Sequence, residues 1–245
     1  MSVSVVVPAY NEQELLPACL EALLGQTRPP DEIIVVDNNS DDRTAEIAHS
    51  YGVTVLNESR QGIMPAVWAG MNASMGDIIA RCDADSIVPP DWIEQIEKTL
   101  QAHPNAAGVT GVGKFYGTDT VQANLAQGWY MYAYFLLVGS AIANWPLFGS
   151  NCAIRRTVWR EIKDTVHKGH ADIHDDMEIS AHIPPTQPII FRPSLTVEIS
   201  ARALRASDMK RRYLYGWRTL SLHWPANSPW RRWRTRLNNA RFGRS

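Results

Sequence analysis

Two aspartates separated by a single residue, Asp83 and Asp85, follow an apolar stretch of the chain that ends in a turn. A divalent cation that bridges a diphosphate needs hard oxygen ligands on a rigid backbone, and the end of a strand provides such a backbone. Asp is also a favoured turn residue, so a purely structural role for the pair stays open at this point. The pair alone is weak evidence for a cation site, and segments further along the chain strengthen it.

The elements that would position these carboxylates alternate between short β-branched runs and helical segments. This is the pattern of an α/β fold, in which a parallel sheet carries helices on its faces. The expected strands run Val3 to Val7, Glu32 to Asp37, Val53 to Leu56 and Asp77 to Cys82. The expected helices lie near Glu12 to Leu24, Asp42 to Tyr51, Met64 to Met75 and Asp91 to Gln101.

Polar turns follow three of the expected strands, and they run Pro8 to Glu12, Asp37 to Asp41 and Asp83 to Asp85. The carboxyl ends of parallel strands meet at one edge of the sheet, where open α/β sheets bind ligands. Neither a Gly-x-Gly-x-x-Gly nor a Walker sequence occurs in the chain. The usual dinucleotide and P-loop cradles are therefore excluded.

The composition is that of a globular protein, with 245 residues of which 45% are hydrophobic and 20% charged. Such a chain can bury a substantial core as one domain or as one domain with an appendage. Its three cysteines, Cys19, Cys82 and Cys152, are widely spaced and odd in number, which fits a reducing compartment. Residues 1 to 9 lack a basic leader, so we expect a cytoplasmic protein.

The formal charge of −1 conceals an asymmetry between the two ends of the chain. From Ile199 onward, twelve Lys or Arg residues accompany the single acid Asp208, whereas the preceding part has twelve basic residues and twenty-four acids. The two segments therefore carry charges of about +11 and −12. This change predicts a boundary near residue 200, between an acidic body (1–200) that could hold cations and a basic tail (201–245) that could meet anionic surfaces.

Five segments, in order along the chain, resemble the successive signatures of family 2 glycosyltransferases. They are Val5 to Glu12, Ile33 to Thr44, Arg81 to Asp85, Gly149 to Arg156 and His174 to Ser180. The resemblance implies a GT-A fold with a mostly parallel central sheet, helices on both faces and a basic helical appendage at the C-terminus. It divides the body into a nucleotide-sugar-binding half (1–100) and an acceptor-side half (101–200). It also implies transfer of a sugar from a nucleotide-diphosphate donor with inversion at the anomeric carbon.

The resemblance assigns the central chemistry to three acids. Asp85 would be the main ligand to Mg²⁺ or Mn²⁺, and Asp83 would contact the ribose or the cation. Asp176 would be the general base; its neighbour Asp175 points roughly 100° away at a helix start, so only one of the two can face the reaction centre. A direct displacement needs a neutralised leaving diphosphate and a deprotonated acceptor hydroxyl, held in line. His182 stands where relatives often have Arg.

The same resemblance assigns five further residues to the donor. Pro8, Tyr10 and Glu12 would line the nucleotide pocket, Asp37 would accept a hydrogen bond from the base, and Arg60 fits a position that often meets the donor. Asn38 stands where many relatives have a second acid, which leaves the identity of the base open. Each residue also has a structural interpretation, such as a strand end at Pro8 and a turn at Asp37.

Cations beyond the body could also reach the donor. Arg202 and the run Lys210 to Arg212 resemble a stretch that follows the catalytic motifs in small bacterial relatives, where cations reach the diphosphate. The Gln-x-x-Arg-Trp motif of processive members is absent, which favours the addition of a single sugar to a glycan, glycolipid or small-molecule acceptor.

Three histidines, His167, His170 and His174, precede the Asp175-Asp176 pair at spacings of three and four. On a helix they would share one face and mimic a transition-metal site. Gly169 and its polar neighbours instead favour a mobile loop that could close over bound donor. We expect the loop.

The run Trp129 to Ala143 is uncharged and long enough for a helix. A membrane span requires about 20 apolar residues, and this run is interrupted by Gly139 and Ser140 and followed by Asn144 and Pro146. We expect a helix packed beside the acceptor cleft, with an interfacial helix in contact with lipid as the alternative.

The tail interleaves Lys and Arg with Trp217, Trp224, Trp230 and Trp233, which is typical of a basic segment on a membrane surface. Each Lys or Arg near an anionic leaflet contributes about 1 kcal/mol. We therefore expect peripheral contact with an anionic membrane, on the inner membrane face, and no nucleic acid. A basic helix that packs back on the acidic body is the alternative.

Two other functions fit part of the pattern. A sugar nucleotidyltransferase shares the α/β plan, but it normally has a Gly-rich basic loop where Pro8 to Glu12 stands. A non-catalytic sugar-binding or membrane scaffold protein could keep the fold and lose the chemistry, which the intact Asp83, Asp85 and Asp176 argue against. The sugar, the nucleotide, the acceptor and the oligomeric state do not follow from the sequence, because pocket shape decides the first three.

Overall fold

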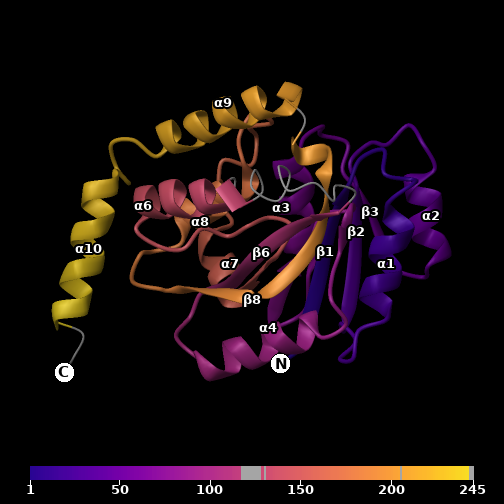
Figure 1. Ribbon diagram of the computed structural model, residues 1–245, viewed down its shortest axis with the longest axis horizontal. Helices are drawn as coiled ribbons and strands as arrows, with labels where there is room; N and C mark the ends of the chain where they lie inside the picture. Colours follow the sequence, from indigo (N-terminus) through magenta and orange to yellow (C-terminus); the bar gives the residue numbers. More distant parts are fainter. Residues whose placement is uncertain (117–127, 130, 205, 243–245) are drawn as a thin grey trace.

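The computed structural model describes residues 1–116, 128–129, 131–204 and 206–242 (Figure 1). Across these residues, eight strands form one sheet in the order β3-β2-β1-β4-β7-β6-β8-β5. The strands are β1 (Val3–Ala9), β2 (Glu32–Asp37), β3 (Thr54–Asn57), β4 (Ile78–Arg81), β5 (Ser86–Ile87), β6 (Gly108–Tyr116), β7 (Cys152–Arg155) and β8 (Ile189–Ser200). β1 to β4 form a parallel half, and β7 runs antiparallel between β4 and β6. β6 and β8 are parallel to each other.

The helices connect and cover these strands. They are α1 (Leu16–Leu24), α2 (Thr44–Ser50), α3 (Ile63–Ala73), α4 (Trp92–Ala102), α6 (Gly139–Ile142), α7 (Arg156–Ile162), α8 (Asp175–His182), α9 (Ala206–Leu222) and α10 (Pro229–Phe242), with a π-helical turn η1 (Tyr134–Val138) and a 3₁₀ turn η2 (Ala201–Leu204). The α/β prediction is confirmed. Most expected elements of the first hundred residues end within two residues of their observed bounds.

The first helix differs most from its expected bounds, because it begins at Leu16 and not at Glu12. The backbone N–H groups of Asn11 and Glu12 donate to the side chains of Ser40 and Thr44, at 3.0 and 2.8 Å. Contacts with the turn after β2 thus hold these residues in a non-helical path. The two polar turns lie side by side at the edge of the sheet, as the sequence predicts.

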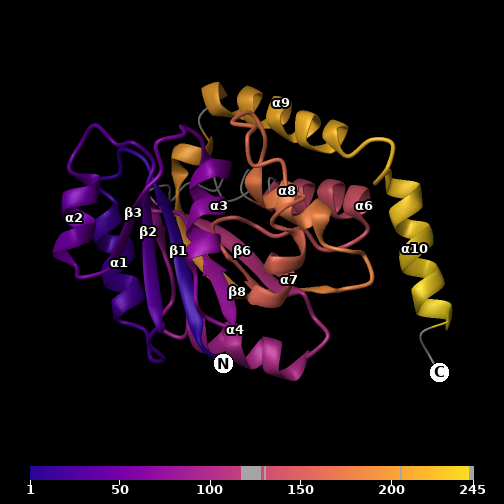
Figure 2. The same ribbon diagram turned by 180° about the vertical axis from the view of Figure 1, so that it is seen from behind.

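The core has two layers because successive side chains of β1 point to opposite faces of the sheet. Val5 and Val7 pack in the layer that includes α1 and α4, whereas Val6 packs in the layer that includes α3, α7 and α8. Figure 2 shows α3 and α7 in front of the sheet from the side opposite to Figure 1. At Gly70 of α3 an added Cβ would lie 2.5 Å from Val6 Cγ1, so only glycine allows this close approach.

Two helices follow the sheet at the C-terminal end. α9 packs against α8 and α10 against α6, and Figure 1 shows α10 along one side of the molecule. The buried guanidinium of Arg232 donates to the carbonyl oxygens of Ile142, Ala181 and Ile183, at 2.6 to 2.7 Å. Burial removes water from the charged group, which lowers the pKa of Arg232 to about 10. At least this part of the basic tail is therefore attached to the body.

The uncharged run from Trp129 to Ala143 is helical over η1 and α6 and ends at Ala143, where φ is 53°. Tyr130, which the expected helix included, lies outside the described residues. Phe135 is buried in the core, while Leu137 is 65% exposed. In the part of the chain that the structure describes, no helix combines the length and the apolarity needed to cross a membrane.

Candidate active site

A cleft of about 1040 Å³ lies at the carboxyl edge of the parallel strands. Its walls come from the ends of β1 and β4, the turn after β2, the segment before β7, the start of α8 and one face of α9. Six of the predicted site residues line this cleft, namely Pro8, Tyr10, Glu12, Asp83, Asp85 and Asp176. The structure therefore brings together acids that are up to 164 positions apart in the sequence.

The two aspartates of the triplet have different partners. Asp83 accepts hydrogen bonds from Arg81 Nη2 at 2.8 Å and from Ser150 Oγ at 2.6 Å. Asp85 Oδ2 lies 3.0 Å from Arg202 Nη2, and the same guanidinium nitrogen lies 2.8 Å from both carboxylate oxygens of Glu12. Arg202 thus joins two carboxylates from the turns that follow β1 and β4.

The acids around Arg202 carry more negative charge than one guanidinium can neutralise. Burial raises the pKa of Asp85, and the charge of Asp83 raises it further, while Arg202 opposes both effects. Burial likewise raises the pKa of Glu12. The carboxylates of Glu12, Asp83 and Asp85 repel one another, and a divalent cation would relieve that repulsion. Together they form an oxygen-rich donor set that fits Mg²⁺ or Mn²⁺.

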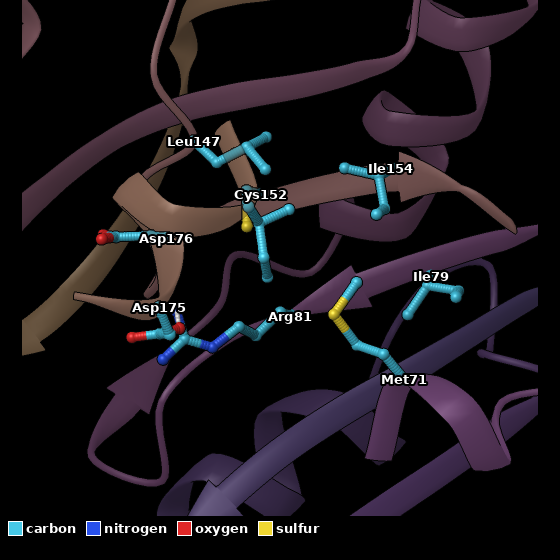
Figure 3. Close-up of a pocket in the computed structure, with 9 residues that line it drawn as sticks. Met71, Ile79, Arg81, Leu147, Cys152, Ile154, Asp175 and Asp176 are labelled. Atoms are coloured by element: carbon cyan, nitrogen blue, oxygen red, sulfur yellow. Dashed lines mark ion pairs between the residues drawn. The ribbon is translucent and has the colours of Figure 1, made fainter. Parts of the chain in front are cut away.

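Arg81 connects the Asp83 side of the cleft to the start of α8. Arg81 is 5% exposed, and its guanidinium lies 2.8 Å from Asp83 Oδ1 and 2.9 Å from Asp175 Oδ2. Figure 3 shows the ion pair with Asp175, with the carboxyl group of Asp176 lying apart from it. At Gly149 an added Cβ would lie 1.8 Å from Arg81 Nη1, so a side chain there would displace the guanidinium.

The adjacent acids at the start of α8 have different surroundings. Asp175 is 5% exposed, and burial raises its pKa to about 6 although Arg81 opposes the shift. Asp176 is only half-buried; its carboxylate accepts from the N–H of Gly149 at 3.1 Å and from that of Met177 at 2.7 Å. The helix N-terminus favours a negative charge at both positions. Asp176 is therefore the more accessible acid of the pair.

Two predicted donor residues are not among the residues that line the cleft. Asp37 is 4% exposed and accepts a hydrogen bond from the N–H of Ser40 at 3.3 Å. Arg60 is half-exposed and pairs with Glu58 at 2.8 Å. That Asp37 and Arg60 contact a bound donor therefore remains a prediction.

Asn38, which the sequence singled out only as a departure from the family, has a clear structural function. Its side-chain amide donates to the carbonyl oxygens of Glu58 and Arg60 and accepts from the N–H of Gly62, each at 2.8 Å. These bonds fix the loop whose Gln61 and Gly62 line the cleft. An acid at this position could not donate the first two bonds.

The three histidines before α8 do not share a helix face, because residues 163–174 form a loop. His174 lines the cleft, and its Nε2 lies 2.9 Å from the carbonyl oxygen of Arg212 in α9. His167 turns to the other side of α8 and contacts Glu178. The expectation of a loop is confirmed, while its motion is a separate prediction.

Comparison with known proteins decides the family. A profile of the family described as "Glycosyl transferase family 2" matches residues 4–162. The chain belongs to glycosyl transferase family 2. The match covers more than half of the chain and includes the segments of β1, β2, β4 and β7 on which the resemblance was based.

Two relatives show how far the similarity extends. The undecaprenyl-phosphate 4-deoxy-4-formamido-L-arabinose transferase of Serratia proteamaculans is 36% identical over 138 residues, which are 52% of this chain and 39% of the relative. Glycosyltransferase AglE of Haloferax volcanii is 35% identical over 119 residues, which are 45% of this chain and 38% of the relative. The matches thus span about two fifths of the length of each relative.

Solved structures confirm the predicted GT-A fold. The mannosyltransferase PcManGT from Pyrobaculum calidifontis, in complex with GDP-Man and Mn²⁺, superposes with a TM-score of 0.64 at 22% identity, over 81% of this chain and 56% of that one. S. aureus TarS 1–349 in complex with UDP-GlcNAc gives a TM-score of 0.64 at 15% identity, over 82% and 59% of the two chains. At these sequence identities the similarity shows a shared fold and nothing more.

Proposed function

We propose that this family 2 protein transfers a single sugar from a nucleotide-diphosphate donor to an acceptor hydroxyl, by direct displacement with inversion at the anomeric carbon. The observation that carries the proposal is the presence of Asp83, Asp85 and Asp176 in the lining of one cleft. A volume of about 1040 Å³ is at the upper end of the range for small-molecule sites, which suits a donor and part of an acceptor together.

Each acid has a distinct task in this proposal. Asp85, with Asp83, would hold Mg²⁺ or Mn²⁺, which when bound supplies positive charge to the leaving diphosphate. Asp176 would accept the proton of the acceptor hydroxyl, and the N–H groups of Gly149 and Met177 orient its carboxylate. Arg81 pairs with both Asp83 and Asp175, so it ties the Asp83 side of the cleft to the start of α8, which carries Asp176.

A variant at the proposed metal ligand tests the cation's role. Asp85→Asn should weaken Mn²⁺-dependent binding of a nucleoside diphosphate at least about 100-fold, since the loss of even a supporting partner of a metal ligand costs up to about that factor. Titration calorimetry with and without Mn²⁺ measures the effect. The exposed Asp41 gives a control of the same chemistry, Asp41→Asn, which should bind as the unmodified protein does. Equal cation dependence in both variants would refute the assignment of Asp85.

A lipid-linked acceptor is favoured by the rim of the cleft. Trp129, Leu137, Tyr213 and Trp217 all line it, and their side chains are 65 to 76% exposed. An apolar rim that is also aromatic fits the interface of a membrane, where a lipid-linked acceptor would present its head group. The Serratia relative is named for transfer to undecaprenyl phosphate, which agrees with this choice. We propose a cytoplasmic protein in peripheral contact with the inner membrane face.

Removing apolar surface from this rim should weaken membrane binding. The double variant Leu137→Asp with Trp217→Ser should bind vesicles that contain phosphatidylglycerol at least about 10-fold more weakly, because burying one large apolar side chain contributes about 1.5 to 3 kcal/mol. Vesicle sedimentation measures the partition. Leu24 of α1 is half-exposed and outside the cleft, so Leu24→Asp serves as the control. If both proteins bind alike, another surface faces the membrane.

Incubation with a panel of nucleotide sugars and Mn²⁺, in the presence of lipid-linked and small-molecule acceptors, tests the proposed function. Release of the free nucleoside diphosphate is the expected result. Release of pyrophosphate from a nucleoside triphosphate and a sugar phosphate would instead indicate a nucleotidyltransferase, and no release with any donor would indicate a non-catalytic protein. Calorimetry with uridine, guanosine and thymidine diphosphates would identify the nucleotide.

A further inference from the structure

Four side chains outside the cleft gather at the face of α8 that points away from it. Glu178 lies in the middle of α8 and is fully buried, and His182 follows it by one helical turn. His167 comes from the loop before α8, and His223 comes directly after α9. One potential ligand atom from each of the four lies within 4.8 Å of those from the others. None of the four lines the cleft.

The histidines surround the Glu178 carboxylate closely. His167 Nδ1 lies 2.8 Å from Glu178 Oε1, His182 Nδ1 lies 3.2 Å from the same oxygen, and His223 Nε2 lies 2.9 Å from Oε2. The centroids of the three imidazole rings are 4.8 to 5.6 Å apart. Three imidazoles bound through nitrogen to one tetrahedral ion, with bonds of about 2.0 to 2.1 Å, have centroids about 5 Å apart. The rings therefore already have the spacing of a metal site.

We propose that His167, Glu178, His182 and His223 together bind one Zn²⁺ ion. Three imidazole nitrogens and one carboxylate oxygen form a ligand set that zinc prefers, whereas Mg²⁺ takes oxygen ligands. The protein would then hold two kinds of metal in two places, a hard cation at the carboxylates of the cleft and zinc behind α8. The zinc would join the loop before α8, α8 itself and the end of α9, and so stabilise the attachment of the C-terminal helices.

Metal analysis of the full chain tests the proposal. Protein equilibrated with Zn²⁺ and passed over a chelating resin should retain one zinc per chain by mass spectrometry of the element. The double variant His182→Gln with His223→Gln should bind zinc at least about 100-fold more weakly, given that the loss of a residue that only supports a metal ligand already costs about 10- to 100-fold. Zn²⁺ should also raise the melting temperature of the unmodified protein and leave that of the double variant unchanged.

Two matched controls separate this site from other metal-binding groups. His170 lies beside the cluster, with its ring centroid 5.9 Å from that of His167, but it is not one of the four ligands. His170→Gln should retain one zinc per chain, and so should Asp85→Asn, which alters only the cleft. The assignment would be overturned if the double variant retained zinc. It would also be overturned if Asp85→Asn lost zinc while the double variant kept it.

Cobalt substitution gives a measurement that does not depend on how well a variant folds. Co²⁺ bound to the unmodified protein should show the intense visible absorption of a four-coordinate ion with nitrogen ligands. An unmodified protein that holds no zinc after the resin, or a cobalt spectrum with only the weak bands of six oxygen ligands, would overturn the proposal.

Discussion

Asp176→Asn should lower the rate of sugar transfer by about 10² to 10⁴ and leave the affinity for the donor unchanged. The amide has nearly the shape of the carboxylate but cannot accept a proton from the acceptor hydroxyl. Both aspartates line the cleft, but Asp176 is half-buried, whereas Asp175 is buried in an ion pair with Arg81. The two neighbours should therefore respond differently, and only Asp176 should act in the proton transfer.

The measurement combines initial rates of nucleoside diphosphate release with calorimetry of donor binding. An amide oxygen can replace only one of the two carboxylate oxygens that accept from Gly149 and Met177. The unfolding free energy of the variant should therefore be measured as well, because an unpaired N–H costs about 1 to 3 kcal/mol. The exposed Asp164 gives the control Asp164→Asn. Turnover within a few-fold of the unmodified rate would rule out Asp176 as the base.

Arg81→Met should lower the free energy of unfolding by about 3 to 5 kcal/mol, since it leaves one partner of a buried ion pair without its counter-charge. Arg81 and the side chain of Asp175 are both less than a tenth exposed, and their ion pair is 2.9 Å long. Methionine fills a similar volume, so lost packing contributes little. The uncompensated carboxylate of Asp175 should account for most of the effect.

Urea unfolding at several pH values measures this loss. Burial already raises the pKa of Asp175 to about 6, and removal of Arg81 takes away an opposing influence. The loss should be smaller at pH 5 than at pH 8, because a protonated carboxyl group needs no counter-charge. Adding Asp175→Asn to Arg81→Met should restore much of the stability at pH 8. A loss under about 1 kcal/mol, or one that is the same at both pH values, would contradict this account of the pair.

The fold of the first half could be predicted because its strands are apolar on both sides. Glu32 to Asp37 was expected as a strand from its β-branched residues, and the structure has β2 over the same residues. A chain in which such strands alternate with helices can adopt only a small set of folds. The start of α1 was predicted too early, since the contacts that keep Asn11 and Glu12 out of the helix come from a turn about thirty residues away.

The partners of the site residues were harder to predict than the residues themselves. Arg81 stands in the sequence only as the start of the Asp83-Asp85 motif, and nothing local indicates that it pairs with an acid 94 positions later. Arg202 was expected to meet a diphosphate, while in the structure its guanidinium contacts Glu12 and Asp85. Such pairs depend on how distant segments converge, which composition and spacing do not reveal.

The histidines illustrate the same limit. His167, His170 and His174 are close in sequence, and a shared helix face would make them a metal site. The structure instead groups His167 with His182 and His223, which lie 15 and 56 positions further along the chain. Glu178, which no motif singled out on its own, is the residue around which they gather.

The anomeric configuration of the first product tests the central claim most directly. A single displacement at the cleft of Asp83, Asp85 and Asp176 must invert the anomeric carbon, so an α-linked nucleotide sugar should give a β-linked product by proton NMR. A product that retains the donor's configuration, or the absence of any product across the donor panel with lipid-linked and small-molecule acceptors, would contradict it.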